Sequence, residues 1–210
     1  YLLFMDLLVA FENDPAGSGM ANFISTRMGM EKYTADGIYH GQKFDLTIID
    51  SPVISADWLD QKFDYEGYVF LSKHAAESGT LALTCHSTGN FNEAKFGGNP
   101  SELAVPYPSL QKQYLQKVWK NRNNFSDFEI TIEATHHGPT HLKKPSIFIE
   151  VGTTEKQWND QELCSSVAKL VIEVMRNREI SYPFAICFGG THYSKKFTDE
   201  LLHGKFALGT

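Results

Sequence analysis

The sequence predicts an α/β fold with a mixed, largely parallel sheet flanked by helices, on three observations. Short apolar runs of strand length, rich in β-branched and aromatic residues, recur along the chain. Amphipathic stretches of helical period lie between some of them, and such alternation is typical of α/β folds. No repeat, low-complexity tract or Pro/Gly/Ser-rich linker interrupts the pattern. The 210 residues are therefore expected to form a single domain, 1–210.

The strand candidates are residues 2–11, 44–49, 68–71, 81–85, 128–134, 147–151 and 184–188. Helices are predicted over 109–121, where Leu110, Tyr114 and Val118 share a face, and over 161–178. Asn159 followed by Glu162 resembles a capping box at the start of the second helix. The segments 14–30 and 93–108 are expected to be polar loops, and loops of that length are often functional.

The net charge of −6 argues against a protein that coats nucleic acid non-specifically, and no DNA partner is expected. A lysine-bearing stretch such as 112–122 is either a local basic patch or a solvated surface. Three widely spaced cysteines form no disulfide framework, which indicates a reducing, cytoplasmic setting. No apolar run reaches the ~18 residues of a membrane span. The chain begins with Tyr and stops after an apolar run, so truncation at both termini is expected.

Five of the eight histidines fall at or just past the carboxyl end of a predicted strand. They are His74, His86, His136, His137 and His192. Ligands of open α/β sheets bind in the crevice outside those ends, so the five imidazoles are expected to converge. His40, His141 and His203 are interpreted as ordinary hydrogen-bonded residues.

The segment ITIEATHHGPTH (130–141) carries the densest chemistry. If the strand persists, Glu133 and His137 point to one face and His136 to the other, although a bulge would re-aim them to the same side. Gly138-Pro139 then turns the chain. A carboxylate and an imidazole on one face suit a metal ligand with its orienting partner, or a general base with its own.

Glu150 and the pair Gly189-Gly190 are further candidate site residues. Glu150 lies inside the apolar run SIFIEVGT, and a carboxylate there needs a partner. It is a metal ligand, a general base or half of a buried ion pair with a lysine. Gly189-Gly190 either let the backbone approach a ligand and present amide donors to an oxyanion or phosphate, or form a plain turn.

Several imidazoles with a carboxylate suit zinc, and three protein ligands with an open position generate a nucleophilic water near neutral pH. Hydrolysis is therefore the expected reaction class. The sequence has no GxSxG, P-loop, GxGxxG or HExxH motif, which removes the commonest serine esterases, nucleotide hydrolases, dehydrogenases and zinc proteases.

Five blocks then identify a family resemblance. They are NDPAGSGMA (13–21), LSKHAAESGTLALTCHSTGN (71–90), IEATHHGPT (132–140), PSIFIEVGTTEKQW (145–158) and FGGTHYSKKFTD (188–199). In this order they resemble the archaeal and plant D-aminoacyl-tRNA deacylases over nearly the whole chain. The resemblance implies a fold like that of peptidyl-tRNA hydrolases and nucleoside phosphorylases, and a single catalytic domain. It implies hydrolysis of the ester between a D-amino acid and the 3′ end of tRNA, which clears mischarged tRNA, with one or two zinc ions.

The resemblance and the residue chemistry together suggest roles, beginning with the attack of a zinc- or base-activated water on the ester carbonyl. The metal ligands are then His86, His136, His137 and His192, and catalytic roles fall on Glu133, His137, His74 and Glu150. Substrate contacts are assigned to Asp14, Gly17, Lys73, Gly189 and Gly190. Lys73 stands where the family commonly has Arg, and Thr191 where it commonly has Gly. The first difference removes a bidentate fork for phosphate or carboxylate.

Two alternatives stay open. One is an esterase similar to peptidyl-tRNA hydrolase, in which the histidines act without metal. The other is a non-catalytic module that binds an RNA end and uses the same histidines for stacking and phosphate contact. The sequence predicts neither the preferred D-amino acid nor the oligomeric state.

Overall fold

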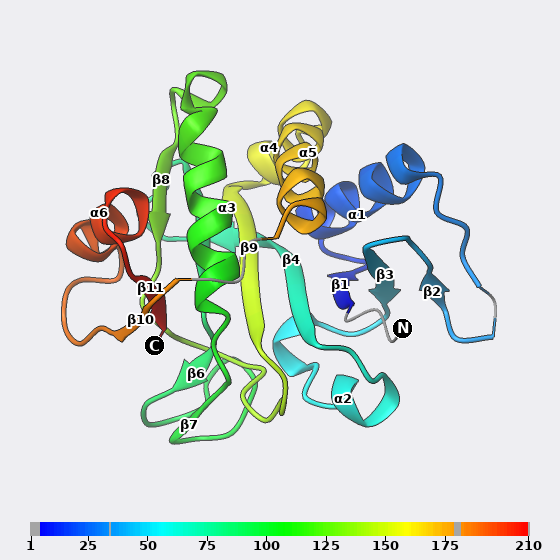
Figure 1. Ribbon diagram of the computed structural model, residues 1–210, viewed down its shortest axis with the longest axis horizontal. Coiled ribbons are helices and arrows are strands. Elements are labelled where there is room, and N and C mark those ends of the chain that lie inside the picture. The colour runs from blue at the N-terminus through cyan, green and yellow to red at the C-terminus, as the bar shows by residue number, and fades with distance from the viewer. Residues whose placement is uncertain (1–4, 34, 179–181, 210) are drawn as a thin grey trace.

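A seven-stranded sheet forms the centre of the computed structural model, which describes residues 5–33, 35–178 and 182–209. Its strand order is β2-β3-β1-β4-β9-β5-β8 (Figure 1). The strands are β1 (Asp6–Phe11), β2 (Ile38–Tyr39), β3 (Phe44–Ile49), β4 (Gly67–Ala75), β5 (Ala82–His86), β8 (Glu129–Ile132) and β9 (Ser146–Thr153). Two small sheets pair β6 (Gly89–Asn90) with β7 (Glu102–Leu103), and β10 (Phe184–Ile186) with β11 (Ala207–Gly209).

The central sheet is mixed and mostly parallel, as predicted. The pairs β1–β3, β1–β4, β4–β9 and β5–β8 are parallel, whereas β2–β3 and β5–β9 are antiparallel. The strands β5 and β8 therefore run opposite to β1, β3, β4 and β9. This reversal decides where the histidines that follow β5 and β8 can lie.

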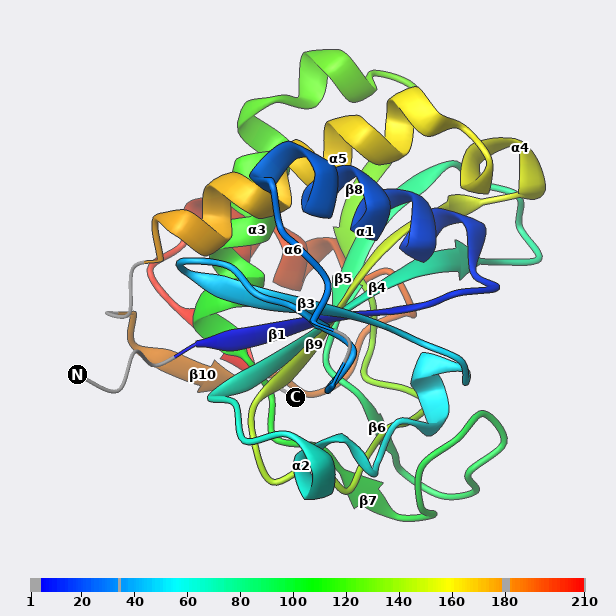
Figure 2. The same cartoon turned by 90° about the vertical axis from the view of Figure 1, so that its right-hand side faces the viewer.

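Three long helices cover one face of the sheet, and shorter elements cover the other (Figure 2). The long helices are α1 (Pro15–Met28), α3 (Pro108–Lys120) and α5 (Gln161–Arg176). On the opposite face lie the 3₁₀ turn η1 (Val53–Ser55) and the short helix α2 (Leu59–Lys62). The other short elements are the 3₁₀ turn η2 (Arg122–Phe125), α4 (Glu155–Trp158) and α6 (Lys195–His203). Helix α6 contacts β8 and α3. Two apolar clusters result, one on each side of the sheet.

The predicted helices are confirmed as α3 and α5, with one change at the start of α5. Its N-cap is Asp160 rather than Asn159, and the Asp160 carboxylate accepts from the backbone N–H groups of Glu162 and Leu163. A capping box does form nearby, between Thr154 and Gln157 at the start of α4.

The prediction of a loop over 14–30 is wrong, because α1 occupies most of that segment. Asp14 caps the helix and Pro15 takes its first position, where proline is favoured. The glycines at 17 and 19 lower the helical propensity of the stretch. Packing outweighs that cost: Met20 and Ile24 on α1 are fully buried against the sheet.

The last predicted strand, 184–188, does not join the central sheet, since β10 pairs with β11 in a separate two-stranded sheet. Residues 2–4 of the first predicted strand lie outside the described residues. Within the described ranges, none of the helices combines the length and apolar content that a bilayer crossing needs.

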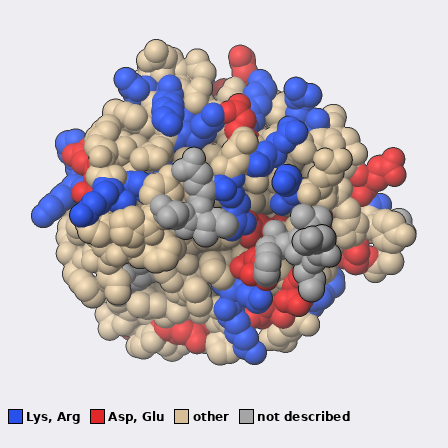
Figure 3. All heavy atoms as spheres, in the orientation of Figure 1, with Lys and Arg blue, Asp and Glu red and all other residues tan. Residues whose placement is uncertain are grey.

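The basic stretch 112–122 does not act as one surface patch. Lys112 is buried, and its ammonium donates to the carbonyl oxygens of Leu201, Gly204 and Phe206 at the end of α6. On the face that α3 and α5 cover, lysine and arginine side chains lie among acidic ones, and an area at the lower left of the view carries few charges (Figure 3).

Candidate metal and catalytic site

The candidate site lies on the sheet face opposite the three long helices. Glu150 on β9 is level with Ser72 of β4 on one side and with Thr84 of β5 on the other. Phe148, two residues before Glu150 and on the same face, belongs to the apolar cluster on this side. His86, the last residue of β5, is paired with Phe148.

The histidines converge, but not in a crevice outside the carboxyl ends of parallel strands. Because β5 and β8 run antiparallel to β4 and β9, the carboxyl end of β5 lies beside the first half of β9. His86 therefore sits over the face of the sheet, whereas His74 lies near the carboxyl end of β4. The location predicted from the parallel-sheet rule was wrong, and the convergence was right.

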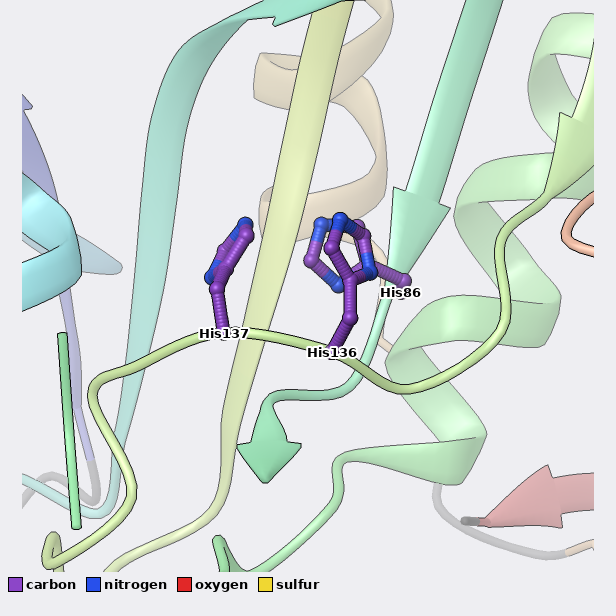
Figure 4. Close-up of side chains that lie close together, drawn as sticks. All are labelled: His86, His136 and His137. Atoms are coloured by element: carbon purple, nitrogen blue, oxygen red, sulfur yellow. The ribbon is translucent and has the colours of Figure 1, made fainter. Parts of the chain in front are cut away.

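The segment after β8 brings the adjacent histidines onto this face. The strand ends at Ile132, and His137 adopts the left-handed backbone region with φ of 46°. Strict alternation therefore fails, and His136 and His137 point to the same side of the segment, toward His86 (Figure 4). Of the two arrangements that the sequence left open, the re-aimed one is present.

Each of these three histidines turns Nδ1 to a backbone carbonyl oxygen. The distances are 3.0 Å from His86 to Ser87, 2.8 Å from His136 to Ala134 and 2.7 Å from His137 to Gly138. A carbonyl only accepts, so the hydrogen is on Nδ1 and Nε2 is left as the free ring nitrogen. This is the orientation that metal-bound histidines usually have.

The electrostatics of His136 and His137 fit a ligand role. Burial, reinforced by the nearby His86, lowers the pKa of His136 to about 3 and that of His137 to about 4. Both imidazoles are therefore neutral near pH 7, as metal binding requires. Burial opposes protonation of His86 as well, but Glu150 and Glu133 raise its pKa, so a metal ion would take the place of that proton.

The Nε2 atom of His86 is buried and has no hydrogen-bond partner among the described residues; its nearest carboxylate oxygen, on Glu150, is 3.8 Å away. An orphaned nitrogen of this kind costs free energy unless something occupies the space beside it. The residues present therefore fit a metal ion.

Two buried carboxylates flank His74. Its Nδ1 donates to Glu150 Oε2 at 3.2 Å and lies 3.0 Å from Glu133 Oε1, outside hydrogen-bond geometry. Burial disfavours the charged imidazole, but the two carboxylates outweigh it and raise the pKa of His74 to about 9. Despite burial, the histidines around Glu133 and Glu150 lower the pKa values of both carboxyl groups.

Tyr193 is a site residue that the sequence reasoning missed. Its hydroxyl lies 2.5 Å from His74 Nε2. The preceding His192 places its Nε2 2.8 Å from Glu133 Oε2, and the backbone N–H of Ala134 donates to the His192 carbonyl. The GGTHY block thus reaches the site by folding back onto the segment after β8. The only sequence signal for Tyr193 was its place in that block.

Three groups of side chains have ligand atoms within 4.8 Å of one another. They are His86, His136 and His137; Glu133, His136 and His192; and His74, Glu133 and Glu150. All four predicted metal ligands and the predicted catalytic residues belong to this one connected cluster. The cluster can hold a metal ion.

Two of the cavities that adjoin the cluster share Glu133. The larger, of about 520 Å³, is also lined by His74, His136, His137 and His192. The smaller, of about 300 Å³, is lined by Gly189 and Gly190, both of which have positive φ.

The other predicted substrate contacts, Asp14, Gly17 and Lys73, lie in three different environments. Asp14 lines the larger cavity, but one of its carboxylate oxygens caps α1 and the other accepts from Ser72 Oγ and the Lys73 N–H. Gly17 packs on β4 within α1, where a Cβ would meet the Leu71 carbonyl oxygen at 2.3 Å. Lys73 lines the cavity, with its ammonium 4.7 Å from the centre of the Trp158 ring.

The remaining histidines lie outside the cluster, as expected. His40 pairs with Asp45 and Asp36, and His141 pairs with Glu102. The ring of His203 packs edge-on to Trp119.

Comparison with known proteins agrees with these features. The family model described as D-aminoacyl-tRNA deacylase matches residues 61–210. The chain is 61% identical to the D-aminoacyl-tRNA deacylase of Cenarchaeum symbiosum over 98% of its length and 78% of that protein. It is 33% identical to that of Archaeoglobus fulgidus, over 98% of this chain and 76% of the relative.

A solved structure has the same fold. The crystal structure of a conserved protein of unknown function matches with a TM-score of 0.94 at 32% identity, over 100% of this chain and 76% of that one. Together with the family match, this result is clear: the chain belongs to the D-aminoacyl-tRNA deacylase family.

Proposed function

We propose that the chain hydrolyses the ester between a D-amino acid and the 3′-terminal ribose of tRNA, with zinc held by His86, His136 and His137. Family membership supports the reaction. The observation that carries the metal assignment is the set of three imidazoles whose Nδ1 atoms are all held by backbone carbonyls. Imidazole nitrogens suit zinc among the common metals.

His192 extends the proposal to a second ion. It forms a ligand group with Glu133 and His136, so His136 is common to the two candidate ligand groups. When bound, zinc supplies a Lewis acid that polarises the ester carbonyl and lowers the pKa of water.

Glu133 and His74 then act as proton acceptor and proton donor. Glu133 faces both cavities and is held ionised, so it accepts the proton of the attacking water. The carbonyl carbon gains the water oxygen, and its bond to the ribose oxygen breaks. His74, held in place by Glu150 and Tyr193 and protonated near neutral pH, returns a proton to that ribose oxygen.

The substrate contacts follow from the two cavities. Gly189 and Gly190 present backbone to the smaller one, and Asp14 and Lys73 border the larger. Gly17 supports the substrate pocket only indirectly, by letting α1 approach β4. The proposal includes a single catalytic domain over 1–210, a cytoplasmic location and D-aminoacyl-tRNA as partner.

The test is hydrolysis of D-Tyr-tRNA against L-Tyr-tRNA, with and without a zinc chelator. D-selective hydrolysis that the chelator abolishes and added zinc restores is the expected result. Hydrolysis that the chelator leaves unchanged would overturn the catalytic metal and favour the metal-free esterase. No hydrolysis of either substrate by the zinc-loaded protein would overturn the enzymatic function and favour an RNA-end-binding module.

A further inference from the structure

A pair of exposed phenylalanines stands beside the histidine cluster. Phe91 is 62% exposed and Phe96 is 66% exposed. Both line a surface groove of about 660 Å³, whose wall also contains His136 and His137. Phe96 lines the larger active-site cavity as well, so the groove is continuous with the place where the ester would lie.

The segment that carries these rings is firmly anchored. The amide of Asn90 donates to the carbonyls of Gly97 and Asn99 at 2.9 and 3.1 Å. The N–H of Gly138 donates to the Phe96 carbonyl at 3.0 Å, which ties the segment to the residue that follows the histidine pair. The two rings are therefore presented to solvent by fixed backbone, and a ligand that covers them orders little new structure.

Glycine at position 138 is required for this anchoring. A Cβ on Gly138 would meet the backbone N of Gly98 at 2.3 Å and the Ile54 carbonyl oxygen at 2.4 Å. The groove and the histidine segment are thus held in mutual contact through backbone.

The charge of the groove indicates what it binds. Its carboxylate and ammonium, Glu93 and Lys95, lie 3.4 Å apart and offset one another. A groove with aromatic walls and little net charge suits flat, neutral rings better than phosphate groups.

We infer that Phe91 and Phe96 form a stacking platform for the unpaired bases at the 3′ end of the tRNA substrate. This inference rests on the proposed function, because the bases next to the aminoacylated ribose are what the reaction places beside the cluster. Stacking on aromatic side chains is how proteins hold single-stranded RNA without a dense basic surface.

Steady-state deacylation of D-Tyr-tRNA by the zinc-loaded protein tests the platform. Phe96→Ala and Phe91→Ala should each raise KM by about 10-fold with kcat nearly unchanged, since stacking of one base is worth roughly 5- to 150-fold in affinity. Phe96→Trp should keep the wild-type KM. The matched control is Tyr33→Ala, because Tyr33 is 63% exposed but lies beside β2 at the far edge of the sheet.

An abasic nucleotide at the 3′ end completes the test. It should raise KM for the wild type. In the alanine variant that lacks the ring on which the missing base stacks, either Phe96→Ala or Phe91→Ala, it should cause no further increase in KM. An abasic effect of equal size in the wild type and in both variants would overturn the platform. So would a KM change that follows the size of the D-amino acid instead of the base. Wild-type KM in both alanine variants, with active wild type, would reject the platform alone, whereas an inactive wild type would reject the proposed function.

Discussion

The imidazole rings of His86 and His136 lie 4.3 Å apart between centroids, with 31° between their planes. Both rings turn Nδ1 to a backbone carbonyl, and both belong to a group of imidazoles whose ligand nitrogens lie within 4.8 Å of one another. Whatever its protonation, Nε2 of His86 finds no hydrogen-bond partner within the part of the chain described by the structure. Such an arrangement gains stability from a cation between the rings.

Metal content tests that relationship directly. We expect purified protein to retain zinc and His86→Ala to bind it at least about 100-fold more weakly, since loss of a mere supporting residue costs 10–100-fold. His141→Ala is the control, because His141 is exposed and pairs with Glu102 outside the cluster. Elemental analysis after dialysis against a graded chelator gives the result. Equal zinc retention by His86→Ala and the wild type would contradict the assignment.

Glu133→Gln should lower kcat for D-Tyr-tRNA by about 10²–10⁴-fold, because the amide cannot accept a proton from water. Single-turnover deacylation measures the effect, with zinc content determined in parallel. Glu129→Gln serves as the control, since Glu129 begins the same strand β8 but is exposed. A wild-type rate in Glu133→Gln would remove Glu133 from the chemistry.

The sheet order explains why part of this site could be predicted and part could not. Apolar periodicity located β3 and the long helices α3 and α5, and strand-end histidines indicated a cluster. The direction of β5 depends on its pairing with β9, a long-range contact that leaves no local pattern. The predicted place of the histidine cluster was therefore wrong, although the five histidines do converge.

Local backbone geometry set the second limit. Alternation would separate His136 from His137, and only the positive φ of His137 re-aims them. Nothing in the residue types at these two positions specifies that conformation. Tyr193 illustrates the same limit, since its contact with His74 depends on how the segment after β10 folds back. Helix α1 was missed for another reason, because its glycines concealed a buried apolar stripe.

Asp14→Asn separates a structural role from substrate binding. The amide oxygen still caps α1, but the amide nitrogen cannot accept from the Lys73 N–H, which loses its partner. We expect the free energy of unfolding to fall by about 1–3 kcal/mol. Urea unfolding measures it, with Asn13→Ala, an exposed neighbour, expected within about 0.5 kcal/mol of wild type. If Asp14→Asn keeps full stability but raises KM, Asp14 contacts substrate instead.

The contribution of the Glu102 carboxylate to the free energy of unfolding should decrease as the pH falls below about 5. Hydrogen bonds from Thr140, His141 and Asn99 lower the pKa of Glu102 to about 2. A depressed carboxyl pKa stabilises the fold above the unfolded value near 4.5, and that contribution is lost as pH falls toward 2. Glu102→Gln should cost about 1 kcal/mol at pH 6, a modest figure because the carboxylate is partly exposed. The difference from wild type should vanish near pH 2.

The raised pKa of His141 has the opposite effect on stability, because its contribution is lost as pH rises and that of Glu102 is lost as pH falls. Its pairing with Glu102 stabilises the fold below pH 6.5 and is lost as pH rises through the folded value. Chemical unfolding of wild type and Glu102→Gln from pH 2 to pH 9 should therefore show the largest difference between about pH 4.5 and 6.5. A difference that does not change with pH would contradict both contributions.

A pair of glycines in α1 offers a matched test of the packing that supports the cluster. At Gly17 a Cβ would meet the Leu71 carbonyl oxygen at 2.3 Å, whereas at Gly19 its nearest neighbours are side-chain atoms of Cys164 and Gln161 at 3.6 and 3.7 Å. Gly17→Ala must push α1 away from β4, so we expect a loss of about 1–3 kcal/mol.

Gly19→Ala should instead raise the free energy of unfolding by about 0.5–1 kcal/mol, because alanine restricts the unfolded chain and fits the space. Because β4 carries His74, the Gly17→Ala displacement should also lower kcat, while Gly19→Ala leaves it unchanged. Thermal unfolding and deacylation of both variants measure the two effects. Equal shifts in the two variants would mean that the contact with Leu71 does not require glycine at position 17.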